Sequence, residues 1–347
     1  MNLDCIVVGF GLAGMALVKQ LEDNDKSFVV FEDASQTSSN VAGGVYNPVI
    51  LKRFTPVWKG TEQINYAIPF YKELEAKFHK KYDYTFDTYR VFKSIEEQNN
   101  WFAASDKPLL APYMDTQIVT NKFRGIISEN GFGRLHKTGR IDTKNLLDDY
   151  KVYLEKTKRI IYDTFDYDSI VFNDPKISYK NISSTTIVFC EGFGMHKNPY
   201  FKDLPLNEVK GELLTIHAPL LDADFLIKSA VFVLPLGNHY FKVGATFNWT
   251  DKTSTTTEEA KFELLSKLDS FINVPYEVVH QSAGVRPTVK DRRPLVGRHP
   301  VQNSLVILNG LGTRGVMIAP TLAAQLYQYL FENASLDQEC DIARFYK

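Results

Sequence analysis

The feature that most constrains how this chain can fold is a glycine motif near its start, Gly9–Gly14, which reads GFGLAG. A short apolar run at residues 5–8 precedes the motif and is typical of a strand buried on both faces. The residues that follow, 12–21, place apolar side chains at helical spacing. A second apolar run, 28–31, ends at Glu32, about 20 residues beyond the glycines, where an acid can accept hydrogen bonds from ribose hydroxyls. This order of strand, glycine turn, helix, strand and acid predicts a βαβ unit that binds a dinucleotide.

Each part of the motif has a physical role in binding phosphate. Gly9 permits the tight turn after the strand, Gly11 lets the backbone approach a pyrophosphate, and Gly14 lets the helix pack closely on the strand. The first helical residues, Leu12 and Ala13, supply N–H groups at the positive end of the helix dipole. The motif by itself does not distinguish NAD from FAD.

The composition indicates a large globular protein without an evident charged partner. Its 347 residues, 44% of them hydrophobic, are enough for two domains of ordinary size or one large interleaved unit. The net charge of −1 gives no whole-molecule reason to expect nucleic acid or an anionic membrane as a partner. The sequence shows no run of about 18 apolar residues and no signal-type segment, so we expect no membrane span.

Cysteine usage bears on the cellular compartment. The three cysteines, Cys5, Cys190 and Cys340, are few, odd in number and widely spaced. They form neither a metal-binding spacing nor a disulfide framework, which favours a reducing compartment. The sequence therefore predicts a cytoplasmic protein.

Outside the glycine motif, the pattern predicts a mixture of helices and strands. A helix is expected over residues 61–78, with Pro69 at a kink or an early turn. Residues 84–95 and 117–128 alternate as strands do. The threonine-rich stretch before Glu258 is expected to cap a helix that begins there.

The second half of the chain indicates that the domains are interleaved. After Asp142, a plausible N-cap, a helix is expected with a buried stripe of Leu146, Leu147, Tyr150 and Leu154. Near the C-terminus, a strand at 305–308, a glycine-rich turn at 310–315 and a helix at 316–331 repeat the opening pattern. We therefore expect the C-terminus to return to the first domain, giving an interleaved two-domain α/β architecture.

Five separated segments together resemble the FAD-dependent oxidoreductases that include D-amino acid oxidase, glycine oxidase and sarcosine oxidase. The resemblance covers essentially the whole chain, and its segments, in family order, are Gly9–Gly14 with Glu32, residues 42–44, 189–192, 283–297 and 310–315. It implies that the cofactor is FAD. The FAD is expected to be bound without a covalent link, because no cysteine lies between Arg286 and Gly297, where sarcosine oxidases attach their flavin.

The resemblance also implies the fold. It is α/β, with a Rossmann-like FAD-binding domain interleaved with an antiparallel-sheet α+β substrate domain. The FAD-binding domain is expected at residues 1–50, 135–205 and 280–347, and the substrate domain at residues 51–134 and 206–279.

The resemblance assigns further residues to the cofactor. Ser38, Ser39 and the turn of Ala42, Gly43 and Gly44 resemble the stretch beside the pyrophosphate, where small side chains permit close approach. The alternative is an ordinary glycine loop. The helix after the C-terminal glycine turn would stabilise negative charge on the flavin, and a plain capping loop is the alternative. The rest of the predicted set is Asp33, Ile161, Gly192, Gly310, Gly312, Thr313, Arg314, Gly315 and Val316; at Glu191 the family usually has a small residue.

Four residues are candidates for the chemistry. Arg286 resembles the arginine that binds the substrate carboxylate, and the alternative is an ion pair with Asp291. Arg314 resembles a second substrate arginine, although glycine oxidase places that arginine one residue earlier than Arg314 stands here. Strand alternation puts Tyr240 and Lys242 on one face, where the sarcosine oxidase branch has a lysine that assists oxygen reduction near flavin N5. An exposed strand lysine and a core tyrosine are the alternatives.

The implied reaction is oxidation of a C–N bond in an amine that resembles an amino acid or an N-substituted glycine. A hydride passes to flavin N5, the imine hydrolyses, and O2 reoxidises the flavin. The sequence leaves the oligomeric state open. An NAD-dependent dehydrogenase and a catalytically silent flavin-binding protein are the alternatives from other classes.

A second substrate is also possible within the family. The form Gly-x-Gly-Thr-Arg-Gly around Arg314 resembles the FAD domain of the bifunctional tRNA 5-methylaminomethyl-2-thiouridine biosynthesis protein, which acts on a modified wobble uridine. The net charge does not favour tRNA as a partner. A local basic face for RNA would consist of Lys52, Arg53, Lys290, Arg292, Arg293 and Arg298. The alternative is that these charges belong to an ordinary solvated surface.

Overall fold

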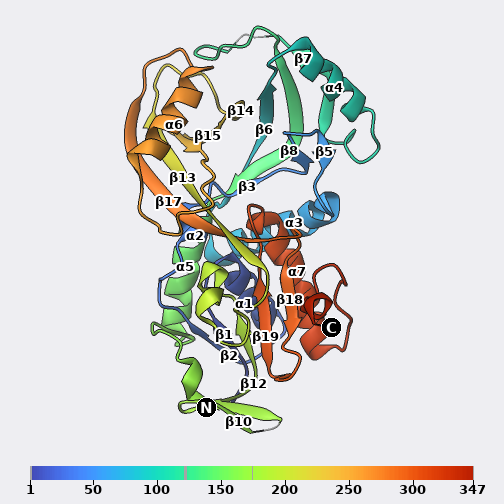
Figure 1. The fold of residues 1–347 in the computed structure, drawn as a ribbon, viewed down its shortest axis with the longest axis vertical. Helices are drawn as coiled ribbons and strands as arrows, with labels where there is room; N and C mark the ends of the chain where they lie inside the picture. Colours follow the sequence, from blue (N-terminus) through green and yellow to red (C-terminus); the bar gives the residue numbers. More distant parts are fainter. Residues whose placement is uncertain (1, 121–122, 174, 347) are drawn as a thin grey trace. The chain divides into compact units, whose positions relative to one another are not determined.

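The computed structural model describes residues 2–120, 123–173 and 175–346 and divides into two compact units (Figure 1). Unit 1 comprises Met1–Ala42, Thr143–Val209 and Val285–Lys347, and unit 2 comprises Gly43–Asp142 and Lys210–Gly284. The chain thus passes between the units after residues 42, 142, 209 and 284, whereas the sequence placed these passages after residues 50, 134, 205 and 279. Which ligand each unit binds stays a prediction.

Unit 1 is built on a mixed sheet whose centre is parallel. Its parallel strands lie in the order β9 (Ile160–Ile161), β2 (Phe28–Phe31), β1 (Asn2–Val8), β12 (Ile182–Phe189) and β19 (Leu305–Asn309). β2 and residues 5–8 of β1 have the continuous apolar composition that burial on both faces requires. Antiparallel strands extend the sheet, namely β10 (Ile170–Asn173), β11 (Lys176–Tyr179) and β18 (Leu295–Arg298).

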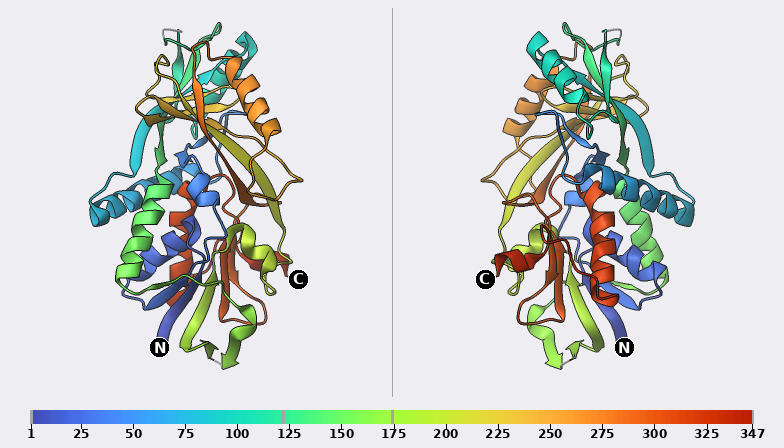
Figure 2. Two further views of the ribbon diagram at one scale, coloured as in Figure 1. Left: turned by 90° about the vertical axis from the view of Figure 1, so that its left-hand side faces the viewer. Right: turned by 90° about the vertical axis from the view of Figure 1, so that its right-hand side faces the viewer.

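Three helices of unit 1 lie side by side on one face of this sheet (Figure 2). They are α1 (Leu12–Asp23), α5 (Thr143–Lys156) and α7 (Gly315–Phe331), and α1 contacts both of the others. The stripe predicted for α5 is confirmed, because Leu146, Leu147, Tyr150 and Leu154 are all buried. The short helices of unit 1 are α2 (Ser38–Val41), η1 (Tyr167–Ser169), η2 (Gly192–Lys197) and η3 (Ile342–Phe345).

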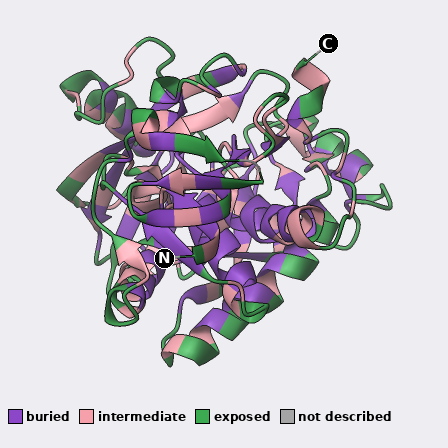
Figure 3. Ribbon diagram, turned by 90° about the horizontal axis from the view of Figure 1, so that it is seen from below, coloured by how far each residue is buried: buried purple, intermediate pink, exposed green. Residues whose placement is uncertain are grey.

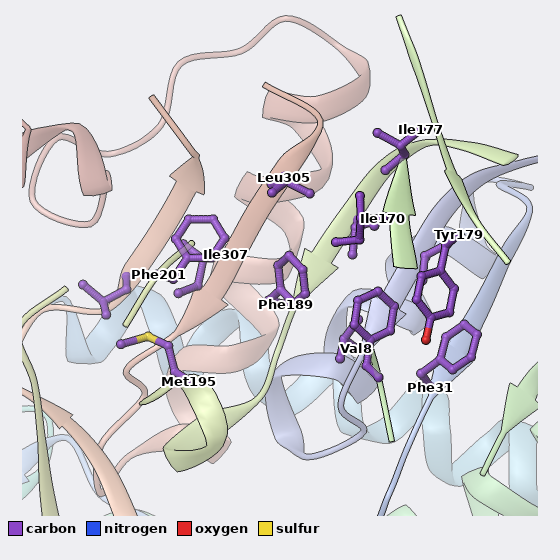
Figure 4. Close-up of a cluster of buried hydrophobic side chains, with 14 of the residues drawn as sticks. Val8, Phe31, Ile170, Ile177, Tyr179, Phe189, Met195, Phe201, Leu305 and Ile307 are labelled. Atoms are coloured by element: carbon purple, nitrogen blue, oxygen red, sulfur yellow. The ribbon is translucent and has the colours of Figure 1, made fainter. Parts of the chain in front are cut away.

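A cluster of aromatic and aliphatic side chains packs against the sheet of unit 1 (Figure 4). Phe189 of β12 is fully buried within it, and Val8, Phe31 and Ile307 come from the neighbouring strands. The rings of Phe165 and Tyr179 stack with their centroids 4.2 Å apart. This cluster gives the parallel strands an apolar layer and so fixes their register.

Unit 2 is built on a larger, mainly antiparallel sheet. Its strand order is β17-β13-β16-β15-β14-β6-β8-β3, with β7 paired to β8, and only the β14–β6 contact is parallel among the described pairings. The strands are β3 (Val45–Tyr46), β6 (Asp83–Val91), β7 (Met114–Val119), β8 (Phe132–Ile141), β13 (Leu206–His217), β14 (Leu226–Lys228), β15 (Phe232–Gly237), β16 (Tyr240–Gly244) and β17 (Glu277–Val289). The hairpin β4 (Val49–Ile50) and β5 (Thr55–Pro56) and the helices α3 (Gly60–Phe78), α4 (Ile95–Ser105) and α6 (Glu258–Asp269) complete this unit. The predicted combination of α/β and antiparallel α+β structure is confirmed.

Two of the predicted strands of unit 2 are shorter than the sequence suggested. β6 ends at Val91 because Ser94 already caps α4, its side chain accepting a hydrogen bond from the backbone N–H of Glu97 at 3.2 Å. β7 ends at Val119, and within the predicted strand 117–128 the described residues from 123 onward include Gly125, whose φ of +88° breaks an extended chain. Residues 121 and 122 of that prediction lie outside the described residues.

Two helix predictions for unit 2 also have clear outcomes. α3 continues through Pro69, which lies in the middle of the helix and not in an early turn, and the predicted kink there stays a prediction. Pro69 is exposed, so water can hydrogen-bond the carbonyl that its missing N–H leaves unpaired. The threonine cap is confirmed, because the Thr257 side chain accepts a hydrogen bond from Ala260 at the start of α6.

Burial follows these elements (Figure 3), with buried residues along the strands and exposed residues on loops and outer helix faces. No helix among the described residues is both long and apolar enough to cross a membrane. The cytoplasmic location stays a prediction.

Replacing Phe189 by alanine tests the core of unit 1. The substitution removes a fully buried ring from the cluster, and we expect it to lower the free energy of unfolding by about 3–5 kcal/mol. Urea denaturation followed by far-UV circular dichroism measures the change. The control Phe262→Ala, at a ring that is 75% exposed, should change it by less than about 0.5 kcal/mol, and equal effects of the two variants would contradict the assignment of the core.

Candidate functional site

The glycine motif of unit 1 brings two backbone segments into direct contact. Gly9 has a φ of +92°, and a Cβ on it would lie 2.7 Å from the carbonyl oxygen of Cys190 at the end of β12. A Cβ on Gly14 would lie 2.1 Å from the carbonyl oxygen of Gly9. Both distances are far below van der Waals contact, so any side chain at Gly9 or Gly14 would force the turn, α1 and β12 apart.

The start of α1 is suited to bind an anion. Gly11 is the N-cap, and among the described residues no side chain caps it and no acid lies in the first turn. The backbone N–H of Leu12 donates to Ser39 Oγ at 3.1 Å, and a Cβ on Gly11 would lie 3.0 Å from that oxygen. Ser38 donates to the carbonyl of Val285, which fixes α2 beside the turn. The dipole of this 12-residue helix and the other N–H groups of its first turn are therefore suited to bind a phosphate.

Glu32 supports the glycine turn as well as lining the site. Its buried carboxylate accepts hydrogen bonds from the N–H of Phe10 at 2.6 Å and the N–H of Ala34 at 3.1 Å, and Lys151 Nζ lies 3.3 Å away. Two carboxylate oxygens offer about four acceptor sites, so one remains for a ribose hydroxyl. Sequence reasoning missed Lys151, because it lies on α5, far along the chain from Glu32.

Glu191, the departure from the family pattern, is buried at the end of β12. Tyr167 donates its hydroxyl proton to Oε1, and Asn198 Nδ2 donates to Oε2 at 2.8 Å. Burial raises the pKa of Glu191 to about 7, with a smaller contribution from Asp33, while the two hydrogen bonds oppose the shift. Two neutral donors thus accommodate a carboxyl where the family has a small side chain. Neither donor is recognisable from the sequence.

The C-terminal strand, turn and helix place the start of α7 beside the start of α1. Gly310 and Gly312 have φ values of +74° and +61°, which the turn between β19 and α7 requires. A Cβ on Gly315 would lie 3.0 Å from Leu12 Cδ1, so α7 begins next to the first turn of α1. α7 also has neither a side-chain cap nor an acid in its first turn among the described residues. Two positive helix ends, about 300 residues apart in sequence, therefore meet within unit 1.

Both candidate arginines belong to unit 1, on segments joined by a hydrogen bond. The N–H of Gly312 donates to the carbonyl of Pro287 at 3.0 Å, which ties the turn before Arg314 to the strand that holds Arg286. Burial lowers the pKa of Arg286 to about 10. Burial, and then the nearby Arg292, lower the pKa of Arg314. The Asp291 side chain is instead bound by Arg344, whose Nε lies 3.1 Å away.

Of the predicted residues of unit 2, Tyr240 and Lys242 lie on β16, and Gly44 directly precedes β3. Gly44 has a φ of +65°, and its Cβ would lie 1.9 Å from the Ile141 carbonyl oxygen, so no other residue fits. Lys242 is half-buried rather than solvent-exposed, and its pKa is lowered by burial and by Arg140. Tyr240 is 41% exposed, with its ring 4.7 Å from the ring of His217, so the alternative of a core tyrosine is wrong.

The remaining predicted cofactor residues differ in exposure. The carbonyl of Ile161 accepts a hydrogen bond from the N–H of Glu32 at 3.0 Å, and Asp33 follows on the surface. Ala42 ends α2, Thr313 is exposed, and Val316 is buried in the first turn of α7. A Cβ on Gly43 would lie 3.4 Å from Leu234 Cδ2. The carbonyl of Gly192 accepts a hydrogen bond from the side-chain amide of Asn309 at 2.8 Å.

The basic residues considered for a nucleic-acid face are partly neutralised. Arg293 forms an ion pair with Glu339 at 2.8 Å, and Arg298 donates to the carbonyl of Asn303. Lys290 and Arg292 of unit 1 are exposed, as are Lys52 and Arg53 of unit 2.

FAD fits the residues of unit 1. The two helix ends without acidic side chains suit its phosphates, the glycines let α1 start directly at the end of the strands, and Glu32 keeps an acceptor for a ribose hydroxyl. Gly9, Gly11, Leu12, Ala13 and Gly14 would hold the pyrophosphate. The start of α7 would stabilise negative charge on the flavin ring.

Comparison with known proteins supports this interpretation. The family model described as FAD dependent oxidoreductase matches residues 4–329. The tRNA 5-methylaminomethyl-2-thiouridine biosynthesis bifunctional protein of Campylobacter jejuni subsp. doylei is 24% identical over 308 residues, covering 85% of this chain. Glycine oxidase of Bacillus subtilis is 28% identical over 42% of this chain and 41% of its own length. The crystal structure of iminodiacetate oxidase from Chelativorans sp. BNC1 matches with a TM-score of 0.81 at 15% identity, over 97% of this chain and 98% of its own.

The bifunctional relative is much longer than the matched region. This chain covers 46% of its length, so the activity of that whole protein does not transfer by similarity alone.

The Glu191→Gln variant tests the buried carboxyl. A carboxyl with a pKa of about 7 when folded and 4.5 when unfolded takes up a proton on folding between those pH values. The free energy of unfolding should therefore fall as pH rises from 4.5 to 7, by about 3 kcal/mol from this group. The glutamine variant should lose that part of the slope in urea titrations across this range. Exposed Glu96→Gln is the control, and parallel slopes for wild type and Glu191→Gln would show that this carboxyl does not titrate there.

Proposed function

Because the chain belongs to the family of FAD-dependent oxidoreductases, we propose that it oxidises the C–N bond of a small amine that also has a carboxylate. The observation that most supports this substrate is Arg286. This arginine is half-buried, burial lowers the pKa of its guanidinium to about 10, and its strand is hydrogen-bonded to the turn before α7. A planar guanidinium in such surroundings suits bidentate binding of a carboxylate.

Bound FAD supplies the hydride acceptor at N5 and the means of reducing O2. The protein has to bind and orient the amine so that its α-carbon faces the acceptor. Arg286 would bind the carboxylate, and Arg314 offers a second guanidinium on the neighbouring segment. The N–H groups and dipole of α7 would stabilise negative charge.

Lys242 is the proposed proton donor during oxygen reduction. Burial lowers its pKa, which eases transfer of a proton from Nζ. The imine product hydrolyses in water without further help from the chain. Because the chain matches an FAD-dependent family, the alternative of an NAD-dependent dehydrogenase is set aside.

A tRNA-borne amine is the second candidate substrate. The observation that favours it is the similarity to the bifunctional tRNA biosynthesis proteins over 85% of this chain, together with the Gly-x-Gly-Thr-Arg-Gly turn at Arg314. In this alternative the enzyme would remove the carboxymethyl group from a modified wobble uridine, and Arg286 would again bind its carboxylate. The ion pairing of Arg293 reduces the charge available for RNA.

Replacing Arg286 by lysine tests the proposed role. The change keeps the positive charge but removes the planar guanidinium that can make two parallel hydrogen bonds to a carboxylate. We therefore expect the substrate concentration for half-maximal flavin reduction to rise about 100-fold. Anaerobic flavin bleaching, with amino acids, N-alkyl glycines and hypomodified tRNA as substrates, measures it. Arg159→Lys is the control, because Arg159 is also half-buried but pairs with Glu22 at 2.6 Å. If none of these substrates bleached the flavin of the wild type, the proposed function would be wrong.

Acid denaturation tests whether FAD is held without a covalent bond. All three cysteines are buried, and burial raises the pKa of Cys5 and Cys190, so their thiols stay protonated and unreactive. We expect the yellow chromophore to remain in the supernatant after precipitation with trichloroacetic acid. Colour that stays with the pellet would contradict this expectation.

A further inference from the structure

The carboxylate of Glu32 in unit 1 keeps one open acceptor position. Its Oε1 accepts hydrogen bonds from the N–H of Ala34 at 3.1 Å and from Lys151 Nζ at 3.3 Å, which use both lone pairs of that oxygen. Its Oε2 accepts only the N–H of Phe10, at 2.6 Å, among the described residues. A ribose has two neighbouring hydroxyls, so Glu32 can accept a hydrogen bond from one of them, and the other needs a different partner.

Lys151 still has free donors beside this carboxylate. An ammonium has three N–H donors, and Glu32 is the acceptor for one of them, with no second acceptor in the parts of the chain that the structure describes. The side chain of Lys151 is 17% exposed and that of Glu32 is 8% exposed, so the pair is largely shielded from water but remains accessible through Lys151. The remaining donors can therefore bind an oxygen atom next to Glu32.

Lys210 of unit 2 shows how this chain satisfies a lysine that needs no ligand. Its side chain is 1% exposed, and its Nζ donates to the carboxylate of Asp251, to the carbonyl of Thr255 and to the hydroxyl of Thr253 at 3.4 Å. The protein thus provides an acceptor for each of the three donors. Lys151 has one such acceptor, so the two lysines differ in the number of donors that remain for a ligand.

The packing of α5 holds Lys151 beside the glycine turn. The ring of the preceding residue, Tyr150, meets the ring of Phe10 edge to face with the centroids 5.5 Å apart, and Phe10 also donates its N–H to Glu32. At the start of the helix, the Thr143 hydroxyl donates to a backbone carbonyl of α2 at 2.6 Å. The backbone of Lys151 is therefore fixed before a ligand arrives, and only its side chain has to be ordered on binding.

The charge of Lys151 also affects the binding of phosphate. Phe10, whose N–H binds Glu32, lies between Gly9 and Gly11 in the turn proposed to hold the pyrophosphate. A buried carboxylate so close to this turn would repel an anion, and the ammonium of Lys151 neutralises that negative charge. Loss of the ammonium should therefore weaken the binding of a dinucleotide.

We propose that Lys151 is a cofactor-binding residue that donates a hydrogen bond to one hydroxyl of the adenosine ribose of FAD, while Glu32 accepts a hydrogen bond from the other. Because the two hydroxyls are on adjacent carbons, a donor and an acceptor that contact each other can hold one hydroxyl each. The pair thereby selects a cofactor in which both ribose hydroxyls are free. The inference rests on FAD as the cofactor and not on the amine that the enzyme oxidises.

FAD analogues that lack one ribose hydroxyl test this assignment. Full-length apoprotein titrated with FAD, with its 2′-deoxyadenosine analogue and with its 3′-deoxyadenosine analogue gives three dissociation constants from the change in flavin fluorescence. In the wild type, we expect the loss of either hydroxyl to weaken binding about tenfold. Lys151→Met keeps the length of the side chain and removes its donors, so FAD should bind about tenfold more weakly. In this variant, the loss of one of the two hydroxyls should then weaken binding by less than about twofold.

The comparison of the analogues separates a hydrogen bond to the ribose from a structural role of Lys151. If the lysine only stabilised the fold or the carboxylate of Glu32, Lys151→Met would weaken the binding of FAD and of both analogues by the same factor, and that result would overturn the proposal. So would a wild type that binds both analogues as tightly as FAD. Lys151→Arg keeps a charged donor and should bind FAD more tightly than Lys151→Met.

The matched control is Lys144→Met on the same helix, because Lys144 is exposed and pairs with Asp148 at 2.6 Å. An exposed ion pair contributes little, so all three dissociation constants should stay within about twofold of the wild-type values. The urea midpoint of each apoprotein checks that the variant is folded. Because the measurement is binding of the cofactor, a negative result leaves the proposed amine oxidation untouched, and failure of the oxidation assays leaves this test unaffected.

Discussion

The contact on which the rest of unit 1 depends is made between backbone atoms at the end of β1. Gly14 lies so close to Gly9 that a Cβ on it would be 2.1 Å from the carbonyl oxygen of Gly9, and a Cβ on Gly9 would be 2.7 Å from the carbonyl oxygen of Cys190. Because no side chain intervenes, α1 starts directly at the carboxyl end of the parallel strands. The start of α7 is held beside it through Gly315 and Leu12. Two helix dipoles therefore act on one small volume, which is what a bound diphosphate and a reduced flavin require.

Three buried charged groups illustrate three different ways of meeting the cost of burial. Glu32 is satisfied by two backbone N–H groups and Lys151. Glu191 receives two neutral donors, and burial raises its pKa to about 7, so near neutral pH a proton replaces the missing cation. Arg140 has neither solution, since its Nε is unpartnered within the described residues and its Nη1 lies 3.8 Å from the carboxylate of Asp142. Equal burial thus leads to different degrees of hydrogen-bond satisfaction, depending on which partners the fold brings to the charge.

The similarity to known structures shows which part of the structure is retained when the sequence changes. A TM-score of 0.81 at 15% identity means that the backbone path is retained while most side chains differ. The glycines are explained by this path, because at Gly9, Gly14 and Gly44 a Cβ would collide with backbone atoms whatever the surrounding side chains are. Glu191, by contrast, is held by side chains, because Tyr167 and Asn198 donate hydrogen bonds to its carboxylate.

The sequence by itself determined the βαβ unit and the return of the C-terminal strand and helix, because these follow from local periodicity and from glycines whose role is steric. The family and FAD as the cofactor followed from the resemblance of five separated segments to a known family. It placed strand ends less well at residues 84–95 and 117–128, where a helix cap and a left-handed glycine override the alternating pattern. Only the tertiary structure decided the pairing of Glu32 with Lys151, the donors around Glu191 and the poor satisfaction of Arg140. Each of these depends on which side chains from distant parts of the chain meet in a low-dielectric place, and sequence spacing contains no information about that distance.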